Sequence, residues 1–322
     1  MKALSIFSGG LDSILASELI RALGIDVQAF FFETPFFSPK KARESAESID
    51  LPLKIIDITE RHLDMIKKPK YGYGENINPC IDCHALMLRI AGEMMEDEGS
   101  DFIITGDVLG QRPMSQNRKA LFIIDRESGF EGLILRPLSA KRLPPTIPEQ
   151  KGWIKRNKML DYSGRSRKPQ MALAKKLNIT KYPSPSGGCL LTDRIFSRRF
   201  ADLLSSNNYI ALRDIELLKL GRHFRIGPKT KIIVGRNEAE NHAISLLAKD
   251  DDLITYTISI PGPTVLVIGE ITPFTDELAA SITASYSDAA EREAEICLSV
   301  KGQSKNLTVK GRDKKEFRQY MI

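Results

Sequence analysis

One short string near the start of the chain, Ser8-Gly9-Gly10-Leu11-Asp12-Ser13, limits the choice of fold more than any other feature. An apolar run at 3–7 precedes it and predicts a buried strand, and leucines and isoleucines at helical spacing follow it as far as Gly24. The string is therefore a glycine turn between a strand and a helix. Gly9 and Gly10 allow the backbone to approach a ligand closely, and the free N–H groups at a helix start attract anions. We expect this turn to bind a phosphate group, with hydroxyls from Ser8 and Ser13.

Strands and helices alternate through the next part of the chain. This alternation predicts an α/β fold with a doubly wound, mainly parallel sheet. Ligands of such sheets bind at the carboxyl ends of the strands. Phe32 ends the second predicted strand, so we expect it at the edge of an adenine and ribose pocket. Apolar runs predict strands at 27–32, 53–58, 101–105 and 133–138, and helices are expected at 39–49, after Cys80, and at 168–177.

A second polar string, Thr105-Gly106-Asp107-Val108-Leu109-Gly110-Gln111, follows the predicted strand at 101–105. It lies at a carboxyl end, as the first string does, so we expect the two strings to meet. Gly106 allows close approach, while Asp107 and Gln111 bring polar atoms to the same place.

These strings resemble motifs of the PP-loop ATP pyrophosphatases, which split ATP into AMP and pyrophosphate in order to adenylate a substrate oxygen. The Ser8–Ser13 string resembles the PP-loop itself. The 105–111 string resembles the second nucleotide-site motif of PP-loop enzymes that put sulfur into tRNA. The resemblance implies a fold like that of the adenine nucleotide alpha hydrolases, ATP and Mg²⁺ as ligands, and Asp12 near the Mg²⁺. The implied nucleotide-binding residues are Ser8, Gly9, Gly10, Asp12, Ser13, Phe32, Gly106 and Gln111.

The chain has four cysteines, and three of them stand in suggestive settings. Cys80 and Cys83 form a C-x-x-C pair at the start of a predicted helix, where negative charge is favoured, so we expect lowered thiol pKa values. Cys189 follows Gly187 and Gly188, which allow a loop to approach a ligand closely. Cys297 lies in a predicted strand and is expected to be structural.

The combination resembles the tRNA sulfurtransferases of the 4-thiouridine synthetase and 2-thiouridylase families. In 2-thiouridylases the first position of the C-x-x-C pair is commonly Asp, and here it is Cys80, which favours a three-cysteine mechanism. The resemblance implies that Cys80, Cys83 and Cys189 hold a 4Fe–4S cluster with one iron open to sulfur. It also implies catalytic roles for Asp12, Asp107, Cys83 and Cys189, and a sulfur donor that is either sulfide or a cysteine desulfurase system.

Several alternatives remain open at this stage. His84 offers a fourth ligand, so the cysteines also suit zinc. A persulfide on Cys83 or Cys189, resolved by the other, suits a 2-thiouridylase without a cluster. The chain as a whole also suits a PP-loop ligase or sulfur-transfer enzyme acting on a small molecule, or a non-catalytic RNA-binding protein with a degenerate nucleotide site.

Charge points to a polyanionic partner. The net charge is +6, and lysine and arginine dominate the segment 136–181 and the tail at 301–318. We therefore expect tRNA to be the partner. No stretch approaches the roughly 18–20 apolar residues of a membrane helix. Met1 and Lys2 lead directly into the first predicted strand, so we expect no signal peptide and a cytoplasmic location.

The pattern changes after residue 193. Short helices and strands in a different order predict a smaller α+β domain at 194–322, similar to the RNA-binding modules of tRNA-handling enzymes, or else a dimerisation or lid domain. Residues 1–193 are then the PP-loop catalytic domain. The sequence does not set the oligomeric state.

Overall fold

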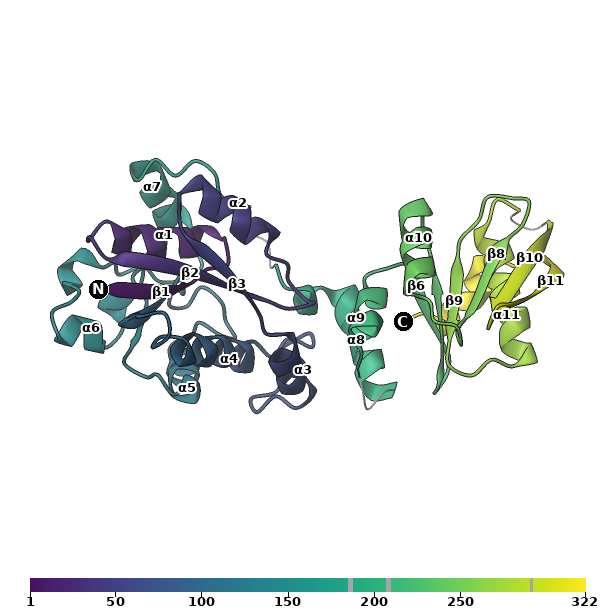
Figure 1. The fold of residues 1–322 in the computed structure, drawn as a ribbon, viewed down its shortest axis with the longest axis horizontal. Coiled ribbons are helices and arrows are strands. Elements are labelled where there is room, and N and C mark those ends of the chain that lie inside the picture. The colour runs from purple at the N-terminus through teal and green to yellow at the C-terminus, as the bar shows by residue number, and fades with distance from the viewer. Residues whose placement is uncertain (185–187, 207–209, 290–291) are drawn as a thin grey trace. The chain divides into compact units, whose positions relative to one another are not determined.

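A computed structural model describes the chain at residues 1–184, 188–206, 210–289 and 292–322. It divides into two compact units, Met1–Thr192 and Asp193–Ile322, which are described separately (Figure 1). Pro185, Ser186 and Gly187, which include the first glycine of the predicted turn before Cys189, lie outside the described residues.

The first unit is built on a five-stranded parallel sheet with the strand order β3-β2-β1-β4-β5. The predicted parallel α/β sheet is therefore confirmed, and its strands match the apolar runs to within a residue or two, except the last. That strand is much shorter than 133–138 because Pro137 has no N–H to donate and Arg136 turns inward to an acidic partner. The strands are β1 Lys2–Ile6, β2 Asp26–Glu33, β3 Leu53–Asp57, β4 Phe102–Thr105 and β5 Ile134–Leu135.

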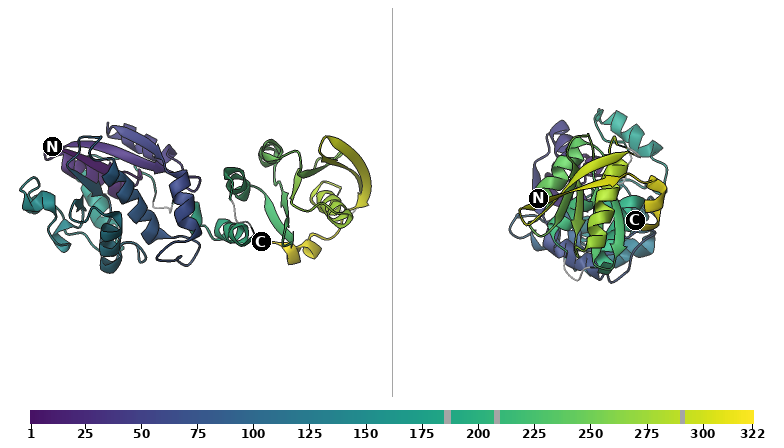
Figure 2. Two further views of the ribbon diagram at one scale, coloured as in Figure 1. Left: turned by 60° about the horizontal axis from the view of Figure 1, so that its bottom comes forward. Right: turned by 90° about the vertical axis from the view of Figure 1, so that its right-hand side faces the viewer.

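Helices cover both faces of this sheet. Figure 1 shows α1, α2 and α7 on one face and α3, α4 and α5 on the other, and Figure 2 shows the same layers from two further directions. The fold is thus doubly wound, as expected. The helices are α1 Leu11–Arg21, α2 Lys40–Ser48, α3 Thr59–Lys67, α4 Cys80–Glu93, α5 Arg118–Ser128, α6 Ile147–Gln150 and α7 Lys168–Lys176, with 3₁₀ turns η1 Ala140–Arg142, η2 Arg156–Lys158 and η3 Leu190–Thr192.

Neighbouring strand residues supply two separate cores. In β1, Ala3 packs into the core beneath α1, α2 and α7, while Leu4 packs into the core beneath α4 and α5. In β2, Phe31 joins the first core and Phe30 joins the second. Successive side chains of a strand point to opposite faces, so a strand buried on both faces must be apolar throughout. This explains why the strands read as continuous apolar runs.

The strand order places a switch point beside β1. The chain passes from β1 to β2 on one side and returns to β4 on the other side, so the loops that follow β1 and β4 part here. In sheets of this kind the crevice between such loops binds ligands. The two polar strings, 8–13 and 105–111, begin at this point.

The second unit contains a six-stranded antiparallel sheet with the strand order β11-β10-β8-β9-β7-β6. Helix α11 packs on one face over a core that includes Phe224 and Phe317, and α9 and α10 pack on the other face around Ile244. The unit is the smaller α+β domain that the sequence predicted. Its elements are α8 Arg194–Ser206, α9 Leu212–Leu218, β6 Arg222–Gly227, β7 Thr230–Val234, α10 Glu238–Leu247, β8 Leu253–Thr257, β9 Val265–Ile268, α11 Pro273–Tyr286, β10 Glu293–Val300, β11 Gln303–Lys310 and η4 Lys314–Tyr320.

Within the described residues, every helix is too short or too polar to span a lipid bilayer.

Candidate functional site

The glycine turn has the geometry that a phosphate site needs. Gly9 has φ +73°, and a Cβ there would lie 2.7 Å from the Cα of Ala42, so no other residue fits without displacing α2. The Ser45 hydroxyl donates to the Gly9 carbonyl at 2.8 Å and holds the turn against that helix. Gly10 is the N-cap of α1 and supplies no side-chain cap to its first N–H groups. The start of α1 can therefore offer N–H donors to an anion.

Asp12 lies in the first turn of α1, and only one of its two carboxylate oxygens accepts a hydrogen bond from the described residues. Its Oδ2 accepts a hydrogen bond from Nε2 of Gln111 at 2.7 Å. Its Oδ1 is buried and has no partner among the described residues. A buried carboxylate oxygen without a donor carries a desolvation cost, which a bound cation would offset.

The loop after β4 packs directly on the start of α1. A Cβ at Gly106 would lie 2.5 Å from the main-chain nitrogen of Ser13, so only glycine allows this approach. Gln111 reaches across to Asp12 and accepts a hydrogen bond from Gln170 of α7 at 3.1 Å. The two predicted strings thus meet. We call the region of 8–13 and 106–116 the nucleotide corner.

The hydroxyls of Ser8 and Ser13 and the ring of Phe32 are less available to a ligand than the sequence suggested. The Ser13 hydroxyl donates to the Gly10 carbonyl at 2.8 Å, and the Ser8 hydroxyl lies 3.4 Å from that of Ser13. The side chain of Phe32 is buried in the core beneath α4 and α5. Its ring therefore cannot line an adenine pocket, and only the main-chain atoms of Phe32 could do so.

Asp107 is the centre of a buried polar cluster. Its carboxylate accepts hydrogen bonds from Thr105 and Gln116, each at 2.8 Å, and lies 3.5 Å from Nε of Arg136. Burial by itself would raise the pKa of Asp107, but the neighbouring His84 and Arg136 outweigh it, so the pKa lies below its ordinary value. Asp107 is therefore an anion in this site rather than a proton donor.

The three cysteines come from two places in the fold. Cys80 and Cys83 open α4, and Cys189 lies just before η3. The segment after Cys189 is held by two hydrogen bonds, from the Leu190 main-chain nitrogen to the Phe36 carbonyl and from the Asn76 side chain to the Thr192 carbonyl, each at 2.9 Å. These contacts carry Cys189 toward the start of α4.

The cysteines interact electrostatically, and their pKa values correct our expectation. Burial raises the pKa of Cys83 well above its ordinary value, and the neighbouring Cys189 and Cys80 raise it further. Burial likewise raises the pKa of Cys189 to about 11. The predicted lowering at the helix start is therefore wrong for Cys83, because removal from water outweighs the helix dipole. We call these three residues the cysteine site.

The cysteine site adjoins the nucleotide corner. Arg112 of the corner lies close enough to Cys189 to act on its pKa. His84 follows Cys83 directly, and its Nδ1 lies 3.9 Å from the Asp107 carboxylate. His84 therefore faces the nucleotide corner. Among the described residues, no three His, Cys, Asp or Glu side chains form a group that could hold a metal ion. The expected metal-binding set of Cys80, Cys83 and Cys189, with or without His84, is therefore not assembled in this structure.

Two residues of the site carried no signal in the sequence. His62 of α3 is fully buried, and its Nε2 lies 3.4 Å from the sulfur of Cys83. Burial lowers the pKa of His62 to about 4, so the ring is neutral. Gln170 of α7 reaches the nucleotide corner from almost sixty residues beyond it. A lone histidine or glutamine on a helix has no local feature that marks such a role.

Two arginines of the basic segment 136–181 are held by partners within the unit. Arg136 is buried and pairs with Asp125 through two hydrogen bonds of 2.7 and 2.8 Å. Arg156 donates to Glu149 at 2.7 Å and to the Leu143 carbonyl at 2.6 Å. The expected polyanion surface must therefore consist of the other basic residues.

Comparisons with known proteins address each unit in turn. Residues 1–142 match the family model described as thiamine biosynthesis protein (ThiI). We call the first unit the ThiI-like unit, because its residues 1–142 are similar to this family. Residues 221–321 match the model described as NFACT protein RNA binding domain. The resemblance to tRNA sulfurtransferases that the motifs indicated is thereby confirmed for the ThiI-like unit.

Curated relatives match less than half of this chain. A probable tRNA sulfurtransferase of Thermoanaerobacter sp. (strain X514) is 26% identical over 148 residues, which is 42% of this chain and 36% of that protein. Another, from Anoxybacillus flavithermus (strain DSM 21510 / WK1), is 30% identical over 148 residues, 42% of this chain and 35% of that protein. The chain thus spans about a third of the length of these relatives.

Among solved structures, a 4-thiouridine synthetase–RNA complex with bound ATP is similar to 56% of this chain and 54% of its own, with 21% identity and a TM-score of 0.35. A TM-score this low carries no inference about function.

Proposed function

We propose that this protein is an ATP-dependent tRNA thiolation enzyme, which adenylates a uridine carbonyl oxygen with release of pyrophosphate and then replaces that oxygen with sulfur. The observation that carries the proposal is the buried Oδ1 of Asp12, which has no partner among the described residues and lies beside Gly106, where the loop after β4 touches the start of α1. The matches to the ThiI model and to tRNA sulfurtransferases support it.

ATP would bind across the nucleotide corner. Its phosphates would face the uncapped start of α1 and the hydroxyls of Ser8 and Ser13. The free oxygen of Asp12 suits Mg²⁺, a cation that takes oxygen ligands. Gln111, fixed by Gln170, keeps the other Asp12 oxygen occupied and so orients the free one.

The cysteine site has the sulfur donors of an iron–sulfur cluster, although among the described residues they do not form a group that could hold a metal ion as they stand. Cys80, Cys83 and Cys189 are free thiols that lie within electrostatic range of one another. Three thiolates so close would repel one another, and a cationic group bound between them would relieve that repulsion. A 4Fe–4S cluster held by these three cysteines would supply a site for a sulfur nucleophile. His62 would hold the Cys83 sulfur in place through Nε2.

The chain's residues would act in two stages. The uridine carbonyl oxygen attacks the α-phosphorus of ATP, the bond between the α- and β-phosphates breaks, and pyrophosphate leaves with the bonding electrons. N–H groups at the start of α1 stabilise the charge that develops on it. At the cysteine site, sulfur then attacks the activated carbon, and AMP leaves with the former carbonyl oxygen.

Binding of tRNA would use basic residues of both units. Lys151, Lys155 and Lys158 are exposed in the ThiI-like unit. In the second unit, Lys310, Arg312 and Lys315 are exposed within the part that matches the RNA-binding model. A sulfur donor, either sulfide or a cysteine desulfurase system, completes the reaction, and a cytoplasmic location remains a prediction.

The test measures pyrophosphate and AMP release from ATP with and without unmodified tRNA, together with mass spectrometry of the tRNA nucleosides. We expect both products to depend on tRNA and a thiouridine to form. Release that depends on a small acceptor and ignores tRNA would favour the small-molecule ligase instead.

The sulfur chemistry is tested with protein purified without oxygen. We expect about four irons per chain, lost together with thiolation in Cys80→Ala, Cys83→Ala and Cys189→Ala and kept in Cys297→Ala. Cys297 is the matched control because it is buried in β10 of the other unit. Thiolation by iron-free protein supplied with a persulfide donor would replace the cluster with a Cys83–Cys189 persulfide pair, and one bound zinc would make the site structural.

A further inference from the structure

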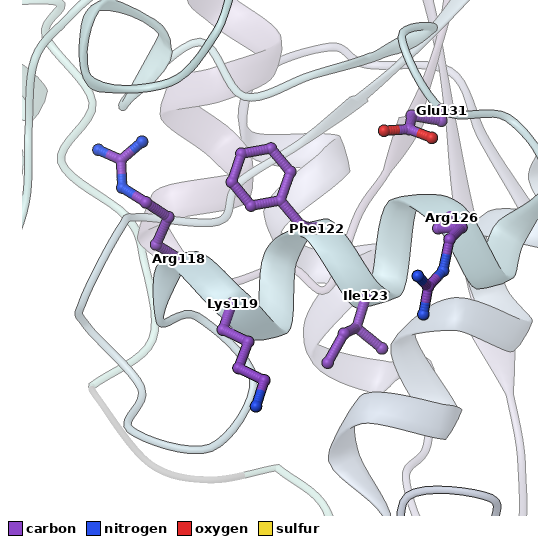
Figure 3. A pocket seen from close by; sticks show the side chains of 6 residues that line it. All are labelled: Arg118, Lys119, Phe122, Ile123, Arg126 and Glu131. Atoms are coloured by element: carbon purple, nitrogen blue, oxygen red, sulfur yellow. The ribbon is translucent and has the colours of Figure 1, made fainter.

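The outer face of α5 bears an exposed aromatic ring between cations. Residues 118, 122 and 126 are spaced four apart and follow one another along the helix as Arg118, Phe122 and Arg126 (Figure 3). The side chain of Phe122 is 42% exposed, although Leu121 and Ile124 beside it in the sequence are buried. The residues around it form a shallow hollow of about 540 Å³, which we call the α5 face: Arg118, Lys119, Phe122, Ile123, Arg126 and Glu131.

The charge of the α5 face is positive and largely uncompensated. Arg118 donates to the Arg142 carbonyl at 2.8 Å, a contact that leaves the guanidinium charge in place. Arg126 is exposed, and the carboxylate oxygen of Glu127 beside it is 3.8 Å away. That oxygen already accepts a hydrogen bond from Lys70 at 2.8 Å, so it neutralises Arg126 only in part. Among the described residues that line the hollow, three cations therefore stand against the single carboxylate of Glu131.

The α5 face begins where the nucleotide corner ends. Gln116 donates to Asp107 at 2.8 Å, and Asn117 caps α5 by accepting from the Ala120 nitrogen at 2.9 Å. Arg118 is thus two residues from a side chain fixed in the corner. From there the stripe runs about 12 Å to Arg126, at 1.5 Å of rise per helical residue.

We propose that the α5 face binds an unpaired segment of the RNA substrate next to the reacting uridine, with one base stacked on Phe122 and phosphates beside Arg118, Lys119 and Arg126. Aromatic rings between basic side chains form such platforms, since every base has a face that stacks and every linkage carries a phosphate. The inference rests on the proposed function, because it assumes that RNA enters the corner. An acidic protein partner fits less well, because Phe122 and Ile123 are the only apolar side chains that line the hollow in the described part of the chain.

The test uses the full chain and two fluorescein-labelled probes, an unmodified tRNA transcript and a short unpaired oligoribonucleotide, with affinity read from anisotropy. Phe122→Ala should weaken binding of both about 5- to 150-fold, the range for loss of one stacked base. Phe122→Trp should keep the affinity, and the new indole should lose fluorescence when RNA binds. Met171→Ala is the matched control, an exposed apolar side chain on α7 of the same unit that should change nothing.

Four outcomes would overturn the inference, and they are distinguishable from one another. Wild-type affinity in Phe122→Ala, with tRNA binding intact, removes RNA from the α5 face and leaves the proposed function standing; unquenched Phe122→Trp fluorescence in the bound state does the same. Failure of the wild-type chain to bind tRNA at low salt removes both proposals. Loss of binding to a purified cysteine desulfurase in Phe122→Ala, with RNA affinity unchanged, assigns the face to a protein partner instead.

Discussion

Each unit of the molecule places a buried or half-buried carboxylate among cations, yet the two clusters differ in which carboxylate oxygens remain free to bind a ligand. In the ThiI-like unit Asp107 lies between His84 and Arg136. In the second unit Asp202 of α8 accepts from Arg225 at 2.8 and 2.6 Å and from Lys231 at 3.2 Å, which ties α8 to β6 and β7. By charge and burial alone the clusters look alike.

The two clusters differ in whether a free acceptor atom and space for a ligand lie beside them. Beside Asp107 the loops meet at Gly106, and the buried Oδ1 of Asp12 has no described partner. Beside Asp202 both carboxylate oxygens are occupied, and the nearby hollow measures about 60 Å³, well below the usual size of ligand pockets. A buried ion cluster therefore does not mark a site by itself. An unpartnered acceptor beside a loop that only glycine can form does.

The sharpest test of this contrast is Asp12→Asn. The change keeps the shape of the side chain and removes the charge that would face Mg²⁺. We expect pyrophosphate release to fall on the order of 100- to 1,000-fold, as when a charge-stabilising group is lost from an active site. Folding should be unchanged in circular dichroism.

The matched control is Asp26→Asn, an exposed carboxylate at the start of β2 and so at the opposite end of the sheet. It should leave pyrophosphate release as it is. Full activity in Asp12→Asn, or release of ADP and phosphate by the wild-type chain, would refute the nucleotide corner as an ATP site.

The converse experiment is Asp202→Asn, which should affect stability and spare catalysis. It leaves the buried Lys231 and the half-buried Arg225 without a countercharge, so we expect the second unit to lose about 2–4 kcal/mol of unfolding free energy, somewhat less than for a fully buried pair. Urea unfolding followed by circular dichroism should show an earlier transition. Trp153, the single tryptophan, lies in the ThiI-like unit, and its fluorescence transition should stay in place.

Glu270→Gln serves as the comparison for Asp202. Glu270 pairs with Lys229 at 3.2 Å on the surface, where such pairs contribute at most about 1 kcal/mol. If Asp202→Asn lowers the unfolding free energy no more than Glu270→Gln does, the Asp202 cluster does not stabilise the second unit.

The pH dependence of stability gives a smaller effect. Burial lowers the pKa of Lys231 to about 8, below its ordinary value of 10.5. Between these values the unfolded chain binds the proton that the folded chain has released, so stability contributed by this residue should rise with pH from about 8 to 10.5. We expect a gain on the order of 1–3 kcal/mol for the second unit.

Lys231→Met isolates that contribution, because Asp202 and His223, whose pKa values Lys231 lowers, both titrate below this pH range. The gain should vanish in the variant, measured by urea unfolding at pH 7.5, 8.5 and 9.5. An unchanged slope in Lys231→Met would mean that the ammonium titrates as it does in water.

The smallest predicted effect concerns the exposed lysines of the ThiI-like unit. Lys155→Glu with Lys158→Glu should weaken tRNA binding and reduce the salt slope by about 0.7–0.9 for each phosphate that is no longer neutralised. ATP affinity should not change. Arg156 is left out because its structural hydrogen bonds would confound the result. Lys67→Glu, outside both basic runs, is the control. It changes the net charge by half as much as the double variant, so a proportionate loss of affinity in Lys67→Glu would mean that binding depends on net charge alone.

Much of this molecule could be predicted from the sequence because its signals are local. The glycine turn at 8–13, the continuous apolar strands and the helical spacing of α1 each depend on neighbouring residues, so strand and helix positions agree closely with the structure. The meeting of the two polar strings followed from a rule about parallel sheets rather than from any measured distance. The antiparallel strand order of the second unit could not be predicted in this way, because strand pairing across long loops has no local signal.

Only the tertiary structure decided which side chains face each other and how dry they are. His62 and Gln170 joined the site through hydrogen-bonding pairs that span 21 and 59 residues of chain. The pKa of Cys83 rose, against the expectation from its place at a helix start, because the fold buries it beside Cys189. Arg136 and Arg156 form hydrogen bonds with Asp125 and Glu149 of the same unit, so their charges are not free for a polyanion. Burial and long-range contact depend on where distant segments pack, which no short window of sequence contains.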